Sequence, residues 1–147
     1  MLKVLLVDDE PFIVQGLSAL IDWEKEGFEI VGTAGNGSEA VEFLKSNPVD
    51  LILADIKMPV MNGLEFLKYI RETHLSEAFF VILSGYGDFT YAKEAIKWQC
   101  TDYILKPIQK SQLLALLSKV KQMQQDKKEE SERIRKIGKA YLVQQMQ

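Results

Sequence analysis

The chain has 147 residues, of which 47% are hydrophobic and 27% charged, a composition typical of one well-buried globular domain with an appendage. Its 21 acidic residues outnumber its 18 basic ones, so the overall charge gives no reason to expect nucleic-acid binding. The lone Cys100 excludes an internal disulfide, and neither a signal peptide nor a membrane-spanning apolar run is found. We therefore expect a cytoplasmic protein that has no contact with membranes.

Short apolar segments alternate with segments of helical periodicity along most of the chain. The expected strands are residues 2–7, 28–34, 51–54, 78–83 and 102–105. The expected helices are residues 12–22, 38–47 with Ser38 as N-cap, 63–70, 89–98, and a last one from Ser111. Five such strand–helix units predict a parallel α/β sheet with helices on both faces, a three-layer (βα)5 sandwich.

The composition changes from about residue 121, where the sequence becomes polar and helix-prone. A heptad that starts at Leu113 carries apolar residues, is interrupted by Lys127 and Glu130, and then resumes. Its apolar positions are Leu113, Leu116, Val120, Met123, Ile134, Ile137 and Tyr141. We assign residues 1–123 to the domain and 124–147 to a helical extension or linker. The extension is either a weakly specified coiled coil or a solvated, partly helical tail, and the pattern favours neither.

Four of the five expected strands end in residues suited to phosphate or metal chemistry. Asp8 and Asp9 follow the first strand, Asp55 the third, Ser84 the fourth and Lys106 the fifth. Parallel strands bring these ends to one edge of the sheet. Three carboxylates there would suit Mg²⁺ or Mn²⁺, while the hydroxyl and the ammonium would suit phosphoryl oxygens. The set indicates a carboxylate nucleophile with metal and cationic support.

Each of these residues also has a simpler structural interpretation. Asp8 and Asp9 could cap the following helix, and Asp55 could be a turn residue. Ser84 and Lys106 could merely end their strands. Taken singly, the structural interpretation is favoured for every residue. The functional one is favoured because all five stand at the ends of strands in the same fold.

The motifs together resemble the receiver domain of two-component response regulators over residues 1 to about 123. The matching segments are VDDEP, Asp55-x-x-Met-Pro-x-x-x-Gly63, Ser84-Gly85 and DYILKP. The resemblance implies a flavodoxin-like sheet with strand order 2-1-3-4-5. Residues 86–96 are similar to receivers joined to an arabinose-regulator-type (AraC-type) helix-turn-helix output domain. Gln99-Cys100 departs from the glycine turn expected before the fifth strand.

The resemblance implies a role for each residue of the site. Asp55 would accept a phosphoryl group from a histidine kinase. Mg²⁺ (or Mn²⁺) would be held by Asp8, Asp9, Asp55 and the backbone carbonyl of Lys57.

Two further residues would bind the phosphoryl oxygens in this family, namely Ser84 and Lys106. Tyr103 would be the switching aromatic residue that turns inward when Ser84 is drawn to the phosphate. The Lys106-Pro107 peptide bond would be cis. For Tyr103, ordinary strand packing is the simpler interpretation.

The implied function is a regulatory phosphoacceptor rather than an enzyme. Phosphorylation would change the face formed by the fourth helix, fifth strand and fifth helix and so control homodimerisation, with DNA bound only through an output domain outside these residues. A stand-alone receiver or an unphosphorylated pseudo-receiver is an alternative. An aspartyl-phosphate phosphatase is a weaker one, because Asp8-Asp9-Glu10 lacks the D-x-D spacing of those enzymes.

Overall fold

The structure is a computed structural model that describes residues 1–85 and 89–145, without the side chains of residue 89 and residues 140–145. Part of the segment that indicated the AraC-type subfamily, residues 86–88, lies outside the described residues. The chain divides into two units, Met1–Leu113 and Leu114–Gln147, and each is described by itself. Within the described residues, no helix is both long and apolar enough to cross a membrane.

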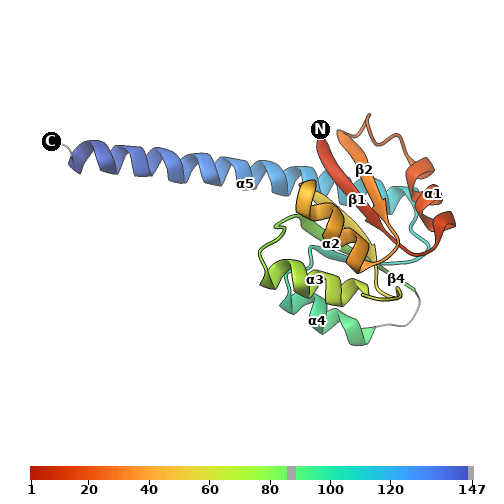
Figure 1. Cartoon of the computed structure of the whole chain (residues 1–147). Helices are drawn as coiled ribbons and strands as arrows, with labels where there is room; N and C mark the ends of the chain where they lie inside the picture. Colours follow the sequence, from red (N-terminus) through yellow and green to blue (C-terminus); the bar gives the residue numbers. More distant parts are fainter. Residues whose placement is uncertain (86–88, 146–147) are drawn as a thin grey trace. The chain divides into compact units, whose positions relative to one another are not determined.

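The described part of the first unit contains one sheet of five parallel strands (Figure 1). Its strands are β1 (Leu2–Val7), β2 (Phe28–Ala34), β3 (Leu51–Asp55), β4 (Phe79–Ser84) and β5 (Asp102–Leu105). Their order is β2-β1-β3-β4-β5, which confirms the flavodoxin-like arrangement. The chain passes from β1 outwards to β2 and then returns to β3 on the other side of β1, so a crevice is expected where β1 and β3 end.

The strand register places the last residues of the inner strands at one edge of the sheet. The paired residues at this edge are Val7 with Ala54, Asp55 with Leu83, and Ser84 with Leu105. Every residue of β3 is buried, as expected for a central strand covered on both faces. Chemistry-bearing residues that follow these strands therefore project from the same edge.

The helices are α1 (Pro11–Leu20), α2 (Gly37–Ser46), α3 (Gly63–Glu72), α4 (Ala92–Lys97) and α5 (Lys110–Gln145). A 3-10 turn, Phe89–Tyr91, precedes α4, so the fourth helix is shorter than its sequence pattern suggested. The prediction that Ser38 caps α2 was wrong. Asn36 is the cap, because its side chain accepts a hydrogen bond from the backbone N–H of Glu39.

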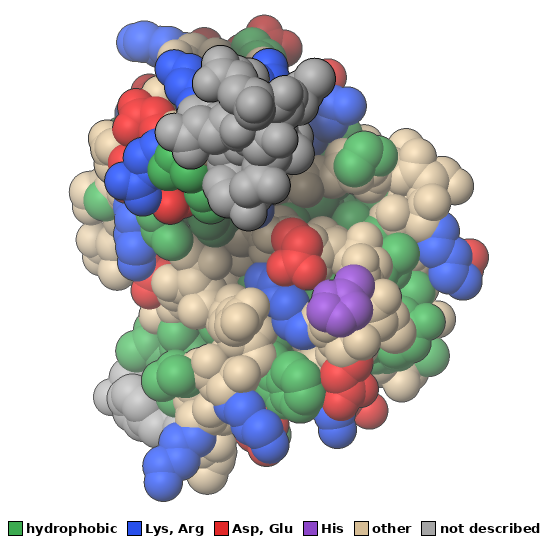
Figure 2. All heavy atoms as spheres, turned by 90° about the vertical axis from the view of Figure 1, so that its left-hand side faces the viewer, with side chains coloured by type: hydrophobic (Ala, Val, Ile, Leu, Met, Phe, Trp, Pro, Cys, Tyr) green, Lys and Arg blue, Asp and Glu red, His purple; other side chains and the backbone are tan. Residues whose placement is uncertain are grey.

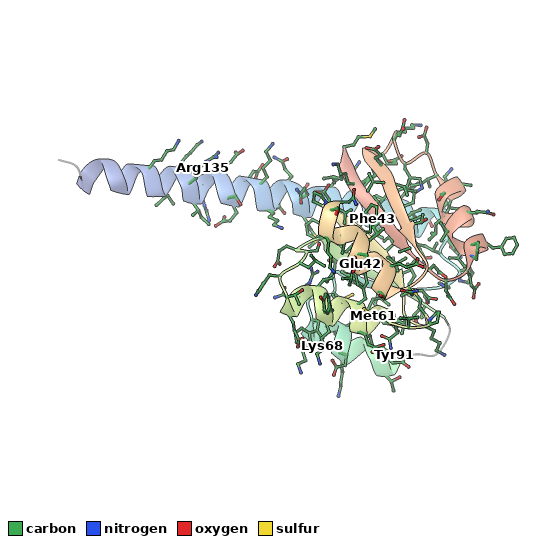
Figure 3. The ribbon with its side chains drawn as sticks, in the orientation of Figure 1. Glu42, Phe43, Met61, Lys68, Tyr91 and Arg135 are labelled. Atoms are coloured by element: carbon green, nitrogen blue, oxygen red, sulfur yellow. The ribbon has the colours of Figure 1, made fainter. Side chains whose placement is uncertain are left out.

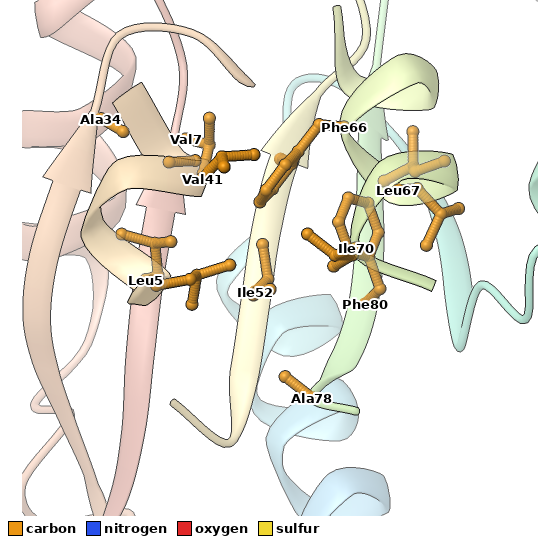
Figure 4. Close-up of a cluster of buried hydrophobic side chains, with 14 of the residues drawn as sticks. Leu5, Val7, Ala34, Val41, Ile52, Phe66, Leu67, Ile70, Ala78 and Phe80 are labelled. Carbon is orange, nitrogen blue, oxygen red and sulfur yellow. The ribbon is translucent and has the colours of Figure 1, made fainter. Parts of the chain in front are cut away.

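Helices cover both faces of the sheet. Figure 4 shows the core between the sheet and α2 to α4, where Phe66 and Phe80 pack with ring centroids 5.5 Å apart. On β4, Leu83 follows Ile82, which belongs to that core. Successive residues of a strand point to opposite faces of the sheet, so Leu83 points to the other face. There it lines a cavity together with α1, which places α1 on the second face.

The second unit consists of α5 from Leu114 onwards, part of one continuous 36-residue helix. Leu116, Leu117 and Val120 are buried. From residue 125 to 139 every side chain is exposed, including Arg135 (Figure 3). The prediction that the last helix continues beyond the domain is confirmed. The side chain of Tyr141, which the heptad pattern included, lies outside the described residues.

Candidate functional site

Three carboxylates meet where β1 and β3 end. Asp8, Asp9 and Asp55 each offer an oxygen, and these oxygens all lie within 4.8 Å of one another. Asp8 is only 6% exposed and Asp55 only 8%, whereas Asp9 is exposed. The cluster follows directly from the strand order, because β1 and β3 are neighbours although more than 40 residues separate Asp9 from Asp55. Two of the three charges are thus largely withdrawn from water.

Lys106 brings a cation to these carboxylates from the end of β5. Its Nζ donates a hydrogen bond of 2.8 Å to Asp8 Oδ2 and lies 3.4 Å from Asp55 Oδ2. The backbone N–H of Lys106 donates to the carbonyl oxygen of Ser84 at 2.7 Å, which anchors the lysine to the end of β4. The Lys106-Pro107 peptide bond is cis, as the resemblance implied.

The pKa values of both Asp55 and Lys106 are raised, which disfavours the charged form of the acid and favours the charged form of the base. Burial raises the pKa of Asp55, and the Asp8 charge adds to this effect while Lys106 opposes it. For Lys106, burial lowers the pKa, but the hydrogen bond to Asp8 and the charges of Asp55 and Asp8 together raise it by more than burial lowers it. The pKa of Lys106 is therefore above its ordinary value, so the lysine is fully charged at neutral pH.

A cavity opens beside the cluster and collects most of the predicted site residues. Its lining includes Asp9, Asp55, Lys57, Ser84 and Lys106. Ser84 is 1% exposed, and its Oγ donates to the carbonyl oxygen of Gly85 at 3.1 Å. The site thus places a carboxylate, a hydroxyl and a cation around a single space.

The lining of this cavity differs from the predicted set of residues in two ways. Glu10 and Ile13 also line the cavity; sequence reasoning did not select them, although both closely follow Asp8-Asp9. Tyr103 does not line the cavity. It is half-buried on β5 and packs against the core beneath α2 to α4.

The loop after Asp55 fixes the orientation of the carboxylate. The backbone N–H of Ile56 donates to Asp55 Oδ1 at 2.8 Å, and the N–H of Gly63 donates to the Ile56 carbonyl at 2.9 Å. A Cβ on Gly63 would collide with the carbonyl oxygen of Asp55, so only glycine permits this close approach. The far end of the loop is held to α2, because the Gly37 N–H donates to the carbonyl of Met61 at 2.9 Å. Met61 is labelled in Figure 3.

The donor set fits a small divalent cation. Mg²⁺ prefers carboxylate oxygens at about 2.1 Å in an octahedron, where ligand oxygens lie about 3 to 4 Å apart. The Asp8, Asp9 and Asp55 oxygens, all within 4.8 Å, need little movement to reach that spacing. The exposed position of Asp9 leaves room for water ligands, which Mg²⁺ usually keeps.

An apolar cavity lies next to the site, between α1 and the segment that follows β5. Phe12, Gly16 and Leu20 line it on one side, and Pro107 and Ile108 on the other. Phe12 is 84% exposed, which is unusual for so large an apolar side chain. Ile13 and Lys106 line both cavities, so this surface adjoins the carboxylates directly. The helical pattern of the sequence gave no sign of this exposure.

The fold is a flavodoxin-like α/β domain. Where β1 and β3 end, it carries a site made of three carboxylates and one lysine. The sequence profile of the response regulator receiver domain matches residues 4–118. The chain therefore belongs to the receiver domain family of response regulators, a regulatory family.

Relatives of known name support the same assignment. The chain is 40% identical over 120 residues to the uncharacterized transcriptional regulatory protein YesN of Bacillus subtilis, covering 82% of this chain and 32% of that protein. It is 37% identical over 120 residues to the transcriptional regulatory protein HptR of Staphylococcus aureus, covering 82% of this chain and 46% of HptR. The chain thus spans less than half the length of these regulators, 32% of one and 46% of the other.

Solved structures agree with the fold and include AraC-type neighbours. The REC domain of AraT, a response regulator from Geobacillus stearothermophilus, superposes with a TM-score of 0.79 and 38% identity over 86% of this chain and 98% of that one. A two-component transcriptional regulator AraC from Clostridium phytofermentans superposes with a TM-score of 0.74 and 33% identity, over 83% of this chain and 94% of that one. The AraC-type resemblance deduced from the sequence therefore has structural counterparts.

Proposed function

We propose that Asp55 accepts a phosphoryl group from the phosphohistidine of a sensor kinase and that this modification controls the output of a longer transcription regulator. The observation that carries the proposal is the position of Asp55. It is a buried carboxylate with Lys106 3.4 Å away and the Ser84 hydroxyl lining the same cavity. Asp9 stands at the exposed side, where a phosphoryl donor would enter.

In the proposed reaction, an Asp55 carboxylate oxygen attacks the phosphorus of the donor. A P–O bond forms, the P–N bond breaks, and the electron pair of that bond returns to the histidine ring. Oδ1 is anchored by the Ile56 N–H and Oδ2 faces Lys106, so the carboxylate is already oriented before a donor arrives. Lys106 and Ser84 would then bind the transferred phosphoryl oxygens.

A divalent cation would neutralise charge that the acids and the phosphoryl group bring together. Asp8, Asp9 and Asp55, with the backbone carbonyl of Lys57, would hold Mg²⁺ (or Mn²⁺). The chain's own contribution is to keep two of these carboxylates buried and fixed: Asp8 Oδ1 accepts the Glu10 N–H at 2.9 Å. Phosphorylation is therefore expected to require the cation.

The proposed signal leaves the site through Ser84. Its hydroxyl donates to Gly85 and would turn to the phosphoryl group, displacing the end of β4. Tyr103 lies on the neighbouring strand β5, paired with Ile82, and would move into the space vacated near Ser84. The surface formed by α4, β5 and the start of α5 would change and favour homodimerisation.

The proposed partner is a histidine kinase that docks on the apolar surface of α1. Exposed Phe12 and the neighbouring cavity adjoin Lys106, so a helix bound there could present its phosphohistidine to Asp55. DNA binding would belong to an output domain beyond a receiver region ending near residue 123, with residues 124–147 as the link. A cytoplasmic location would follow from this partnership.

The decisive experiment is intact mass spectrometry of the protein with Mg²⁺ and acetyl phosphate. Wild type is expected to gain the mass of one phosphoryl group, and Asp55→Asn to gain none. The same samples with a chelator should remain unmodified, and Asp9→Asn should need more Mg²⁺. If wild type gains no phosphoryl group under any of these conditions, it acts as a pseudo-receiver and the proposal fails.

A further inference from the structure

Trp98, the residue that ends α4, has two lysine side chains over its indole ring. The Nζ atom of Lys68, from α3, lies 5.8 Å from the ring centroid, and that of Lys97, from α4, lies 5.6 Å from it. The ring attracts both cations, but it carries no charge that could neutralise them. Among the residues that the structure describes, no carboxylate comes within 4.0 Å of either ammonium group. Two positive charges from different helices thus gather at one aromatic ring.

Arg71 brings a third positive charge to the same place. Its guanidinium is half-buried and donates to four backbone carbonyl oxygens, which include those of Trp98 and Gln99, both at 3.4 Å. Four of its five N–H groups are used in this way, and in the described part of the chain no carboxylate lies within 4.0 Å of it. Burial lowers the pKa of Arg71, although the charge of Glu77 opposes this shift. Since charges withdrawn from water are usually paired, an anion beside Arg71 would stabilise it.

A cavity of about 350 Å³ opens beside these cations. It is lined by Arg71, His74, Glu77, Lys97, Trp98 and Gln99. These residues precede β4 and β5, whereas the three carboxylates of the phosphoacceptor site follow β1 and β3, so the cavity lies at the other end of the parallel sheet. Ligand pockets in proteins begin at about 300 Å³, which leaves room here for a small ligand. Every lining side chain carries a polar atom, and this favours a polar ligand over an apolar one.

Two carboxylates adjoin the cavity and reduce its positive charge. Glu94 Oε2 accepts a hydrogen bond from Trp98 Nε1 at 3.2 Å, and Glu77 Oε1 lies 3.6 Å from His74 Nδ1. The Glu77 side chain is 63% exposed, so water screens its charge. The three permanent cations therefore outnumber the two carboxylates, and the imidazole adds a further positive charge whenever it is protonated.

These groups select the kind of ligand. Guanidinium and ammonium groups bind phosphate and carboxylate oxygens through charge-assisted hydrogen bonds, and an ammonium suits phosphate as a point charge. An anion with more than one negative charge gains most, because it interacts with several cations at once. A metal ion fits poorly, since His74 and Glu77 are the only imidazole and carboxylate among the lining side chains. The cavity therefore favours a small multivalent oxyanion.

We propose that the cavity between α3, α4 and the turn before β5 is a binding site for a small multivalent oxyanion of the phosphate type. Lys97 and Arg71 would contact its oxygens, and Lys68 would add its charge from α3. The bound anion would connect α3 with α4, the two helices that supply these cations. Binding goes beyond the proposed function, because it requires neither Asp55 nor a metal ion. Failure of one proposal therefore leaves the other intact.

Pyrophosphate in metal-free buffer is a suitable probe, and the indole N–H signals of an NMR spectrum report where it binds. Trp98 and Trp23 each give one such signal. The Trp98 signal is expected to shift saturably, with a dissociation constant below about 1 mM at about 0.15 M salt. Trp23 is buried and its Nε1–H donates to the Leu17 carbonyl at 3.0 Å, so its signal should stay in place. A Trp98 signal that does not move up to about 10 mM pyrophosphate would refute the site.

Three variants separate this site from general charge attraction and from the phosphoacceptor site. Lys68→Gln/Lys97→Gln should bind at least about 10-fold more weakly, because it loses two charges at the cavity. Lys110→Gln, which removes an exposed lysine after β5, should bind within about twofold of wild type. Equal weakening in both variants would show unspecific attraction and overturn the proposal, as would loss of the Trp98 shift in Lys106→Met. Thermal unfolding without pyrophosphate should match wild type in the double variant, since both lysines are exposed; if it does not, the two single variants carry the same comparison.

Discussion

The Lys106 ammonium lies closer to Asp8 than to Asp55, with Nζ 2.8 Å from Asp8 Oδ2 and 3.4 Å from Asp55 Oδ2. One cation thus offsets two carboxylates that the fold has buried. Its firmest contact is with the proposed metal ligand rather than with the proposed nucleophile. Asp55 Oδ2 therefore remains the less constrained oxygen, whereas Oδ1 is held by a backbone N–H.

Replacement of Lys106 by methionine should impair phosphorylation far more than it impairs folding. Without the cation, the phosphoryl oxygens lose a charged donor, an effect of about 100-fold or more in comparable sites. The labelling rate with acetyl phosphate and saturating Mg²⁺ should fall accordingly in Lys106→Met. Lys57→Met, an exposed lysine at the same cavity, is the control and should change the rate less than about threefold. Similar rates in both variants would contradict the role of Lys106.

When a chelator keeps metal ions away, the buried, ionised carboxylate of Asp55 should lower the stability of the folded protein at neutral pH. Burial raises its folded-state pKa above the unfolded value, so the folded protein holds the proton more tightly. The contribution of this group to stability is then full below the unfolded pKa and is lost as the pH rises through the folded pKa. Asp55→Asn, which leaves the Lys106–Asp8 pair in place, should therefore be more stable at pH 7, on the order of 1 kcal/mol.

The advantage of Asp55→Asn should shrink as the pH falls towards 3, where both states of wild type carry a protonated carboxyl. Urea unfolding of both proteins across this pH range measures the difference. A constant difference at every pH, or a less stable Asp55→Asn at pH 7, would refute the assignment of the raised pKa to Asp55.

Gly63→Ala should distort the loop between Asp55 and Gly63. The new Cβ would collide with the Asp55 carbonyl, so either the loop or the start of α3 must move. We expect a loss of about 2 kcal/mol or more in stability and strongly reduced phosphorylation. Gly16→Ala on α1 is the matched control, because its Cβ would meet no atom within 4 Å and Gly16 does not line the carboxylate cavity. Thermal unfolding and intact mass distinguish the two variants.

Much of the fold could be predicted from local pattern. The apolar strands and the polar residues at their ends, such as Asp55 and Ser84, are signals that lie within a few residues of each other. The strand order could not be predicted from periodicity; it was implied only by the resemblance to the family. N-caps show the limit of local pattern, since Asn36 and Ser38 are both good capping residues and only the backbone conformation decides between them.

Features of the site that depend on distant parts of the chain could not be predicted. Lys106 and Asp8 are 98 residues apart, and nothing local indicates that the lysine bonds to Asp8 more closely than to Asp55. The exposure of Phe12 likewise depends on where Pro107 and Ile108 lie. The roles of Tyr103 and of the Lys57 carbonyl remain predictions.

Phe12→Ala should weaken transfer from a kinase without affecting the chemistry at Asp55. Large exposed apolar side chains next to a site are frequent determinants of docking affinity. Phosphotransfer from a cognate kinase at limiting concentration should slow by about 10-fold, while acetyl phosphate labelling is unchanged. Ile96→Ala on α4, also a highly exposed apolar residue, is the control and should leave kinase transfer unaffected. Equal slowing with both donors would indicate a folding defect instead.

Arg71 closes the opposite end of the sheet from the site. Its guanidinium donates to the carbonyl oxygens of Ser76 and Ala78 at 2.9 and 2.8 Å, and to those of Trp98 and Gln99 at 3.4 Å. Gln99 has a φ of 62°, which is a left-handed conformation that favours glycine. The family resemblance had led us to expect a glycine turn at Gln99-Cys100. Arg71 and His74 line the same cavity on this side of the domain. Figure 2 shows the face that carries a histidine side chain, in purple, with acidic and basic side chains beside it. Arg71 thus ties the segment before β4 to the turn before β5.

Arg71→Met should lower stability by about 2 to 4 kcal/mol, because it leaves partly buried carbonyl groups without donors. Arg71→Lys should recover only part of the loss, since an ammonium cannot reproduce the planar fork that reaches both segments. Gln99→Gly should raise stability by up to about 1 kcal/mol by relieving the left-handed conformation. Urea unfolding of the three variants measures these effects. A fully stable Arg71→Lys would show that charge alone, rather than the four-carbonyl geometry, holds the turn.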